Sequence, residues 1–508
     1  MTYSSDVGWW ERPWLLVTLV LIAAVPMLWP VTPPLIDLPN HMARFEITSG
    51  IQSSSALNRF FEVDWTLIPN LGVDLLVLTL APLVGVELAV KSIVIVIPVL
   101  TASGLLWISR EVHGRIPATT LFALPLAYGY PFLYGFVNYC LASGLALLSF
   151  GLWLRLGTLG RPGLRAVLFL LISPIVWISH IYGWGILGIL VFGSETVRQG
   201  KLGRGWRRSM WHAALQCLPL AAPLFLMMGW RGQSGGLSEG WFDWQLKAKW
   251  LLGLFRDRWM ALDLISAAVV YGILATALIC RRWLRVDWTL GLPALMLWFT
   301  FAVLPTTLFG SYFASVRLVP YAAAISLLAL QPTLPEGVKH LRWLAASAAA
   351  FYVVRLGTGT ASAVLYDSAH RAELQALNYV ERGSRVVALV GQPCGNQWLI
   401  PRLTNLPSMA IVRRHAFVNG QFAAAGGQNL QIKYRRAGFF TASGSQKVSL
   451  PPCNGPDKPL SRSLSAIPRP AFDYLWIINV SPNYWPRPAG LRPLWHRGNS
   501  ILYRIEKS

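Results

Sequence analysis

Residues 34–47, PLIDLPNHMARFEI, follow closely on the first long apolar run of the chain, residues 14–28. Four ionisable side chains crowd into this short stretch: Asp37, His41, Arg44 and Glu46. Charge is costly inside lipid, so such groups gather where a membrane segment ends or a cavity opens. Pro39 suits the first turn of a helix, so we expect a short helix along the membrane surface over residues 39–49. On that helix His41 and Arg44 share one face with Asp37.

The composition is that of a membrane protein. Of the 508 residues, 54% are hydrophobic and only 13% are charged, whereas soluble chains carry about 25% charged residues. The formal net charge is +22, but the Lys and Arg residues are scattered among apolar runs or lie in the last quarter. That pattern favours orientation in a membrane and attraction to anionic lipid over nucleic-acid binding. Neither zinc-ligand spacing nor a Walker loop occurs in the sequence.

Apolar runs predict eleven membrane spans. They cover about residues 14–30, 86–109, 117–131 and 138–154, a hairpin at 166–197, and 210–229, 260–280, 287–306, 317–330 and 343–360. The positive-inside rule assigns the Arg- and Lys-rich loops between them, such as 155–165 and 198–208, to the cytoplasm. All these loops lie on the cytoplasmic side if residues 71–84 form a juxtamembrane helix that does not cross the membrane. Residues 31–85 then form the first external loop.

The last part of the chain is of a different kind. Residues 1–366 hold the predicted spans, whereas 367–508 contain no long apolar run. Short β-like runs at 385–390, 474–480 and 500–505 alternate with Pro- and Gly-rich loops. We therefore predict an α+β or α/β domain outside the cytoplasm. In such a compartment Cys394 and Cys453 could form a disulfide.

This topology collects polar residues on the external face, at or near the ends of spans. They are Asp37, His41, Arg44, Glu62, Asp64, Asn138, His180, Lys247 and Arg317. Each has a structural alternative: Asp37 as a helix cap, Arg44 and Arg317 as side chains reaching lipid headgroups, and Lys247 in a helical ion pair with Asp243. Their common location favours a functional site, with a carboxylate as general base and cations around an anionic leaving group.

The order of these features resembles the GT-C class of integral-membrane glycosyltransferases. Asp37 closely follows the first span, an interfacial helix comes next, and a second interfacial element with a Pro near its start follows (IPNLGVDLLVLTLAPLVGVELAVKSIVI, residues 68–95). The next membrane helix ends in a basic tail, ISREVHGR, at residues 108–115. Bacterial relatives of aminoarabinose transferase and of protein O-mannosyltransferases are the most similar members of that class. The motifs cover about the first 160 residues, and the rest matches by general architecture.

The resemblance implies a chemistry for these residues. The donor would be a polyprenyl-phosphate-linked sugar, and Asp37 would deprotonate an acceptor that attacks with inversion, with His41 and Arg44 as further catalytic residues. Arg317, together with His180, Arg44 or Lys247, would stabilise the departing lipid phosphate. Asn138, Glu62 and Asp64 would be further binding residues. The acceptor could be a glycan, a lipid or a protein. The expected location is a bacterial inner membrane, with the C-terminal domain in the periplasm.

The sequence also departs from the family pattern. Leu38 stands where a second acid is usual, so Glu46, Glu62 or Asp64 would have to replace it, and Asn138 stands where many relatives carry an acid. No cofactor is expected on these grounds, although a divalent metal ion stays an open alternative. Two other readings are a lipid or glycolipid transporter, which usually shows mid-membrane charges and internal repeats, and a non-enzymatic envelope assembly protein.

Overall fold

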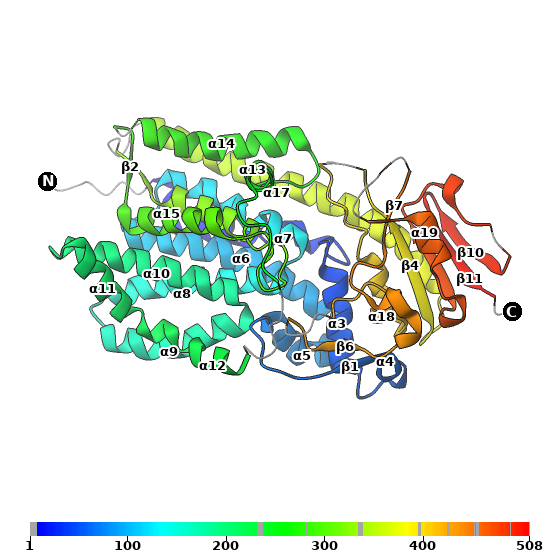
Figure 1. Cartoon of the computed structure of the whole chain (residues 1–508). Helices are drawn as coiled ribbons and strands as arrows, with labels where there is room; N and C mark the ends of the chain where they lie inside the picture. The colour runs from blue at the N-terminus through cyan, green and yellow to red at the C-terminus, as the bar shows by residue number, and fades with distance from the viewer. Residues whose placement is uncertain are drawn as a thin grey trace.

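The structure is a computed structural model in which helices gather at one end and a β-sheet lies at the other (Figure 1). It describes residues 8–230, 237–280, 282–333, 339–394, 398–423, 427–451, 453, 457–487 and 489–506. Between the two ends lie the short elements of the first predicted external loop, packed against part of the C-terminal domain. This central layer positions the site described below.

Every predicted span contains helical structure. The elements are α1 (Pro13–Ile22), α2 (Val25–Leu28), α6 (Val86–His113), η2 (Ala118–Tyr128), α8 (Val137–Thr158), α9 (Pro162–Ser179), α10 (Ile181–Lys201), α11 (Trp206–Gln216), η3 (Leu218–Ala221), α12 (Pro223–Trp230), α14 (Met260–Ile279), α15 (Trp288–Val303), α16 (Val319–Leu328) and α17 (Lys339–Leu374). The predicted class, a helical polytopic membrane protein with a C-terminal sheet-containing domain, is confirmed.

The number of spans, about eleven from the sequence, is approximate. Among the described residues, five helices are long and apolar enough to cross a membrane, or six if the pair α11 and η3–α12, bent by 54°, forms one span. Part of the difference is length, because the first predicted span is the apolar helix Pro13–Leu28, which is shorter than 18 residues. The segment expected at 117–131 is instead a buried 3₁₀ helix with Pro125 inside it.

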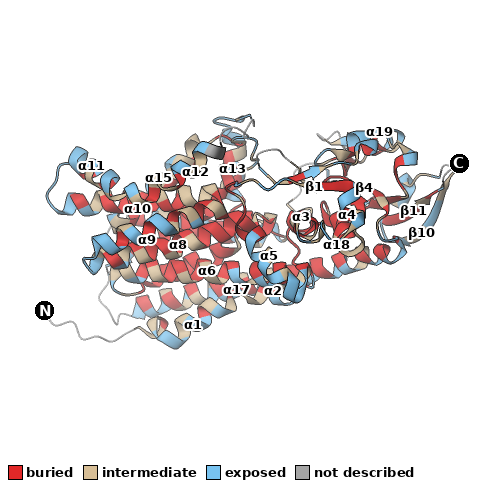
Figure 2. Cartoon of the chain, turned by 90° about the horizontal axis from the view of Figure 1, so that it is seen from below, coloured by how far each residue is buried: buried red, intermediate tan, exposed pale blue. Residues whose placement is uncertain are grey.

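Small residues let the central helices approach closely. A Cβ added at Gly104 of α6 would overlap the side chain of Leu147 on α8, and one at Gly183 of α10 would overlap Ala142 on α8. Backbones in contact at glycine gain dispersion energy that larger side chains would prevent. Figure 2 accordingly shows α6 and α8 largely buried, while α11 carries an exposed face.

The C-terminal domain is a mixed sheet in the order β10-β11-β9-β4-β7-β8, with β5 also beside β4. The strands are β4 (Arg385–Gly391), β5 (Phe417–Val418), β7 (Lys447–Ser449), β8 (Lys458–Pro459), β9 (Tyr474–Ile478), β10 (Leu491–Arg497) and β11 (Ser500–Ile505). The three predicted β-like runs correspond to β4, β9 and β11. A disulfide joins Cys394 and Cys453, whose Cα atoms lie 5.4 Å apart, a normal separation for such a bond.

The first loop is part of the same structure as the C-terminal domain. It contains α3 (Leu38–Gly50), α4 (Ser55–Phe60), β1 (Phe61–Val63) and α5 (Gly72–Val84). Strand β1 pairs antiparallel with β6 (Leu430–Ile432), and α3 packs on α18 (Met409–Arg414). The expected juxtamembrane helix at 71–84 is present as α5, separated from α6 by Gly85 with a positive φ of 78°.

Candidate active site

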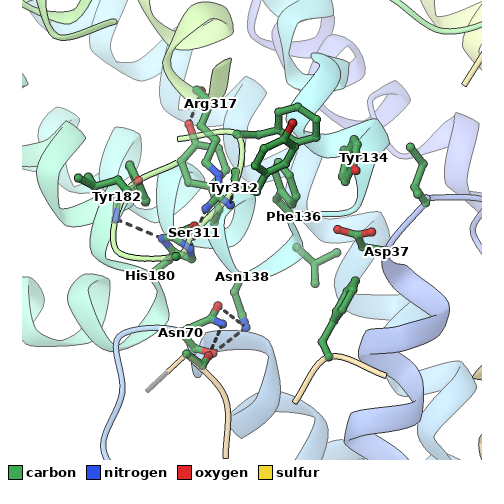
Figure 3. Close-up of a pocket in the computed structure, with 18 of the residues that line it drawn as sticks. Asp37, Asn70, Tyr134, Phe136, Asn138, His180, Tyr182, Ser311, Tyr312 and Arg317 are labelled. Atoms are coloured by element: carbon green, nitrogen blue, oxygen red, sulfur yellow. Dashed lines mark hydrogen bonds between the residues drawn. The ribbon is translucent and has the colours of Figure 1, made fainter. Parts of the chain in front are cut away.

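A cavity of about 1220 Å³ lies between the helical bundle and the C-terminal domain. Its lining comes from the start of α3, from α7 (Tyr130–Tyr134) and α8, from the α9–α10 junction, from the turn after α15, and from the C-terminal domain. Five residues predicted from the sequence contribute to it: Asp37, His41, Asn138, His180 and Arg317. Figure 3 shows how four of them, all but His41, lie around the cavity.

Asp37 is the N-cap residue of α3, but its side chain makes no capping hydrogen bond. Its backbone N–H donates to the carbonyl oxygen of Tyr134 (2.9 Å), and its Oδ1 accepts from the amide of Asn405 (3.0 Å). Gly135, at φ 100°, allows this approach, because a Cβ there would lie 2.9 Å from the Asp37 nitrogen. The carboxylate is thereby turned into the cavity, contrary to the alternative of a helix cap.

The environment of Asp37 suits a general base. The residue is 8% exposed, and this burial raises the pKa of its carboxyl from 3.8 to about 7, against the opposing effects of Lys447, Arg317 and the Asn405 hydrogen bond. A base works best when its pKa lies near the working pH, because it is then both substantially ionised and basic. Asp37 meets that condition at neutral pH.

Arg317 is a buried cation held by aromatic rings. It lies in η4 (Val316–Leu318), is 6% exposed, and its guanidinium lies 4.3 Å from the ring centroid of Phe136 and 5.1 Å from that of Tyr182. One nitrogen lies 3.2 Å from Nε2 of His180, and another donates to the carbonyl oxygen of Tyr312 (3.1 Å). Within the described residues no carboxylate pairs with it, so an anion in the cavity would supply the missing counter-charge.

His41 and Asn138 line the same cavity but differ in the contacts of their side chains. His41 lies one turn after Asp37, between the rings of Phe45 and Phe422, and burial with nearby Arg44 keeps its pKa well below the ordinary value. It is therefore a neutral imidazole. The Asn138 amide is instead fully engaged, with Oδ1 accepting from the backbone of Val73 (2.5 Å) and Nδ2 donating to Asp74 and Asn70.

Four other predicted site residues do not reach the cavity: Arg44, Glu62, Asp64 and Lys247. Arg44 turns away from Asp37 into a buried ion pair with Asp74 of α5 at 2.9 Å. Lys247 donates to the carbonyl oxygens at the end of α15, Phe301 and Leu304, each at 2.7 Å. Glu62 and Asp64 are on or beside β1 with exposed side chains. Sharing the external face did not bring these residues together.

Several polar residues that the sequence reasoning missed also line the cavity, and three of them bear most on the site: Arg256, Asn405 and Lys447. Two of them belong to the C-terminal domain, and Lys447, at the start of β7, is the cation with the largest effect on Asp37. No sequence signal indicated Arg256 or Asn405, and the basic excess of the last quarter was the only sequence signal for Lys447. It indicated that cations are abundant there without indicating which one faces Asp37.

The described residues do not fit a protein-held metal centre. No three His, Cys, Asp or Glu side chains among them lie close enough to hold an ion. Asp37 is the sole carboxylate in the described lining of the cavity, and divalent cations such as Mg²⁺ prefer several oxygen ligands.

Comparisons with known proteins address the fold. A crystal structure of ArnT from Cupriavidus metallidurans in the apo state, an aminoarabinose transferase of the GT-C class, aligns with 96% of this chain and 97% of its own, at a TM-score of 0.52. The chain has the GT-C fold. The two sequences are 13% identical, so the likeness concerns architecture alone. No family model matches the sequence, and no curated protein matches it.

Proposed function

We propose that this protein is a membrane glycosyltransferase that transfers a sugar from a polyprenyl-phosphate donor to an acceptor outside the cytoplasm. One observation carries the proposal. In the described lining of the cavity, a single carboxylate with a pKa near 7 lies together with three cationic side chains: Arg256, Arg317 and Lys447. The GT-C fold, shared with a solved aminoarabinose transferase, supports the reaction class.

The charges match the chemistry of a single displacement. Asp37 takes the proton of an acceptor hydroxyl or amine, which attacks C1 of the sugar from the face opposite the phosphate. The C1–O bond breaks, its electron pair leaves with the phosphate oxygen, and the configuration at C1 inverts. The donor's phosphodiester carries one negative charge and the departing monoester carries two. Arg317 therefore interacts more strongly with the transition state than with the donor, which lowers the barrier.

The part of the cavity lined by α10 is apolar and suits the donor's lipid tail. Trp184, Ile186 and Ile189 of α10 line it together with Leu304, which follows α15. Figure 3 shows Arg317 and His180 near Tyr182 of α10, with Asp37 on the other side of the cavity. A phosphate held at Arg317 would then present the sugar to Asp37 while the prenyl chain follows α10 into the membrane.

The acceptor would enter from the side of the C-terminal domain, whose contribution to the cavity is polar. Gln392, Thr404 and Lys447 lie there, so a polar or anionic acceptor suits this wall. The basic loops at the opposite end of the bundle support a cytoplasmic location for that end. On this assignment the protein is a multi-pass protein of a bacterial inner membrane with its C-terminal domain in the periplasm.

The test compares Asp37→Asn with Asp64→Asn, an acid of the same loop that is exposed and outside the cavity. Each variant is expressed in a deletion strain, and polyprenyl-phosphate sugars in the lipid extract are quantified by mass spectrometry. We expect one donor to accumulate with Asp37→Asn as it does in the deletion strain, because loss of a general base typically lowers the rate about 10²–10⁴-fold. Asp64→Asn should behave as wild type. Normal donor levels in the Asp37→Asn strain would refute the assignment.

A further inference from the structure

A buried hydrogen-bond network connects Asp37 to the interior of the C-terminal domain. Its members are neutral, come from α3 and from the C-terminal domain, and are at most 3% exposed: Asn40, Asn405, Ser408, Gln421 and Gln446. Asn40 contacts Ser408 and accepts from Nε2 of Gln421 (3.1 Å), and Gln421 donates to Ser408 (2.6 Å). The Oε1 atoms of Gln421 and Gln446 have no hydrogen-bond partner among the described residues, so the arrangement depends on the bonds that the other polar atoms of the network make.

Asn405 is the member that reaches the carboxylate. Its Nδ2 donates to Oδ1 of Asp37 at 3.0 Å and to the carbonyl oxygen of Ile36 at 3.1 Å. Its Oδ1 accepts from Nδ2 of Asn40 at 3.3 Å and from Nε2 of Gln446 at 2.8 Å. Both ends of the amide are therefore engaged, and Asn405 is 3% exposed.

The direction of these bonds is fixed by backbone groups. Carbonyl oxygens can only accept, so the neighbouring amide must present its nitrogen. The carbonyl oxygen of Ile36 fixes the orientation of the Asn405 amide in this way. The carbonyl oxygen of Gly420 does the same for Asn40 (Nδ2–O 3.2 Å), and that of Thr404 does so for Gln446 (Nε2–O 3.4 Å). A flipped Asn405 would place oxygen against both Ile36 and Asp37. The N–H of Asn405 therefore points at the carboxylate.

We propose that Asn405 is a positioning residue through which the C-terminal domain orients the Asp37 carboxylate and favours its ionised form. This inference rests on the proposed function, in which Asp37 is the base. It assigns the C-terminal domain a part in the active site itself, since the donor to Asp37 lies on the segment between β4 and α18. Asn405 acts through Asp37 and needs no contact with either substrate.

Other groups also act on Asp37, and the test must separate them from Asn405. Lys447 of β7 and Arg317 of η4 lower its pKa, while Tyr130 and Tyr134 of α7 and His41 of α3 face it as neutral groups. None of these side chains hydrogen-bonds to Asn405 in the described part of the chain. Replacing Asn405 therefore removes one stabilising interaction of the carboxylate and leaves the surrounding charges in place.

The experiment measures the pH at which Asp37 titrates. Full-length protein in lipid nanodiscs is melted between pH 5 and pH 9.5, and each variant is compared with the same variant carrying Asp37→Asn, so that only the titration of Asp37 appears in the difference. We expect Asn405→Ala to raise the pH at which Asp37 is half ionised by about one unit or more. At pH values below that midpoint, the ionised fraction of Asp37 would then be about tenfold smaller. Asn405→Ser, which keeps a donor, should shift the midpoint less.

The matched control is Asn419→Ala. Asn419 is 2% exposed, bonds to Ala388 and Ser445 inside the same domain, and does not line the cavity. It should lower stability without moving the Asp37 midpoint. An unchanged midpoint in Asn405→Ala would overturn the inference, and if that variant does not fold, an unchanged midpoint in Asn405→Leu, which fills a similar volume without a donor, would do so. Donor turnover separates the two proposals, since activity that survives Asp37→Asn would refute the proposed function whatever the titration shows.

Discussion

Replacing Asp37 by Asn should make the protein more stable, and increasingly so as the pH rises. The folded carboxyl has a pKa of about 7 where an unburied one has 3.8. Holding it ionised in the fold therefore costs about 4 kcal/mol. The wild type loses this stability as the pH rises from about 4 to 7 and then loses no more, because an acid whose pKa is raised by folding favours the folded state only while protonated. The Asp37→Asn variant has no such dependence, because an amide does not titrate in this range.

The comparison of pH 5 with pH 8.5 gives the clearest reading. Between those values the advantage of Asp37→Asn over wild type should grow by about 3 kcal/mol, or roughly 3 to 6 °C in apparent melting temperature. Tryptophan fluorescence during heating of the purified protein measures it, with the exposed Asp64→Asn as control. A stability gap that is the same at both pH values would refute the reasoning, because it would mean that Asp37 ionises as an ordinary surface acid.

Three further predictions concern other parts of the structure. Arg317→Gln should lower donor turnover about 10²–10³-fold with little change in melting temperature, since it removes one contact to a developing charge; wild-type turnover would contradict the assignment. Arg44→Met should destabilise the fold by about 3–5 kcal/mol by leaving Asp74 buried without its partner, and thermal unfolding of the double variant with Asp74→Leu should show recovery. Cys394→Ser should cost at most about 4 kcal/mol for a separation of 59 residues from Cys453, measured as a lower melting temperature that reducing agent does not lower further.

The helical part of the fold could be predicted because a segment inside lipid must satisfy its own backbone and be apolar along its length. The apolar run at 117–131 was predicted to be a span because apolarity alone shows only that a segment avoids water. A 3₁₀ helix packed among other helices is as apolar as a membrane span. The number of spans is therefore approximate there and at Pro13–Leu28, where the apolar helix is short.

The site was only partly predictable. Asp37, His180 and Arg317 could be found because each lies at the end of an apolar run, where a membrane protein can accommodate an ionisable side chain. Arg44 was assigned wrongly to the face of Asp37, since helical spacing cannot reveal that Asp74 of a separate helix binds it. Asn405 and Lys447 reach Asp37 only through the packing of a domain far along the chain, for which no local pattern exists.

The distance along the chain between Asp37 and Asn405, 368 residues, has a consequence for biosynthesis. At about 5–20 residues per second, a ribosome needs roughly 20 to 70 s after making the first loop to reach its partners. During that interval α3 and β1 lack their partners α18 and β6. A nascent or truncated chain therefore holds an unfinished cavity, and the site is complete only when the last quarter of the chain has been made and has packed against the loop.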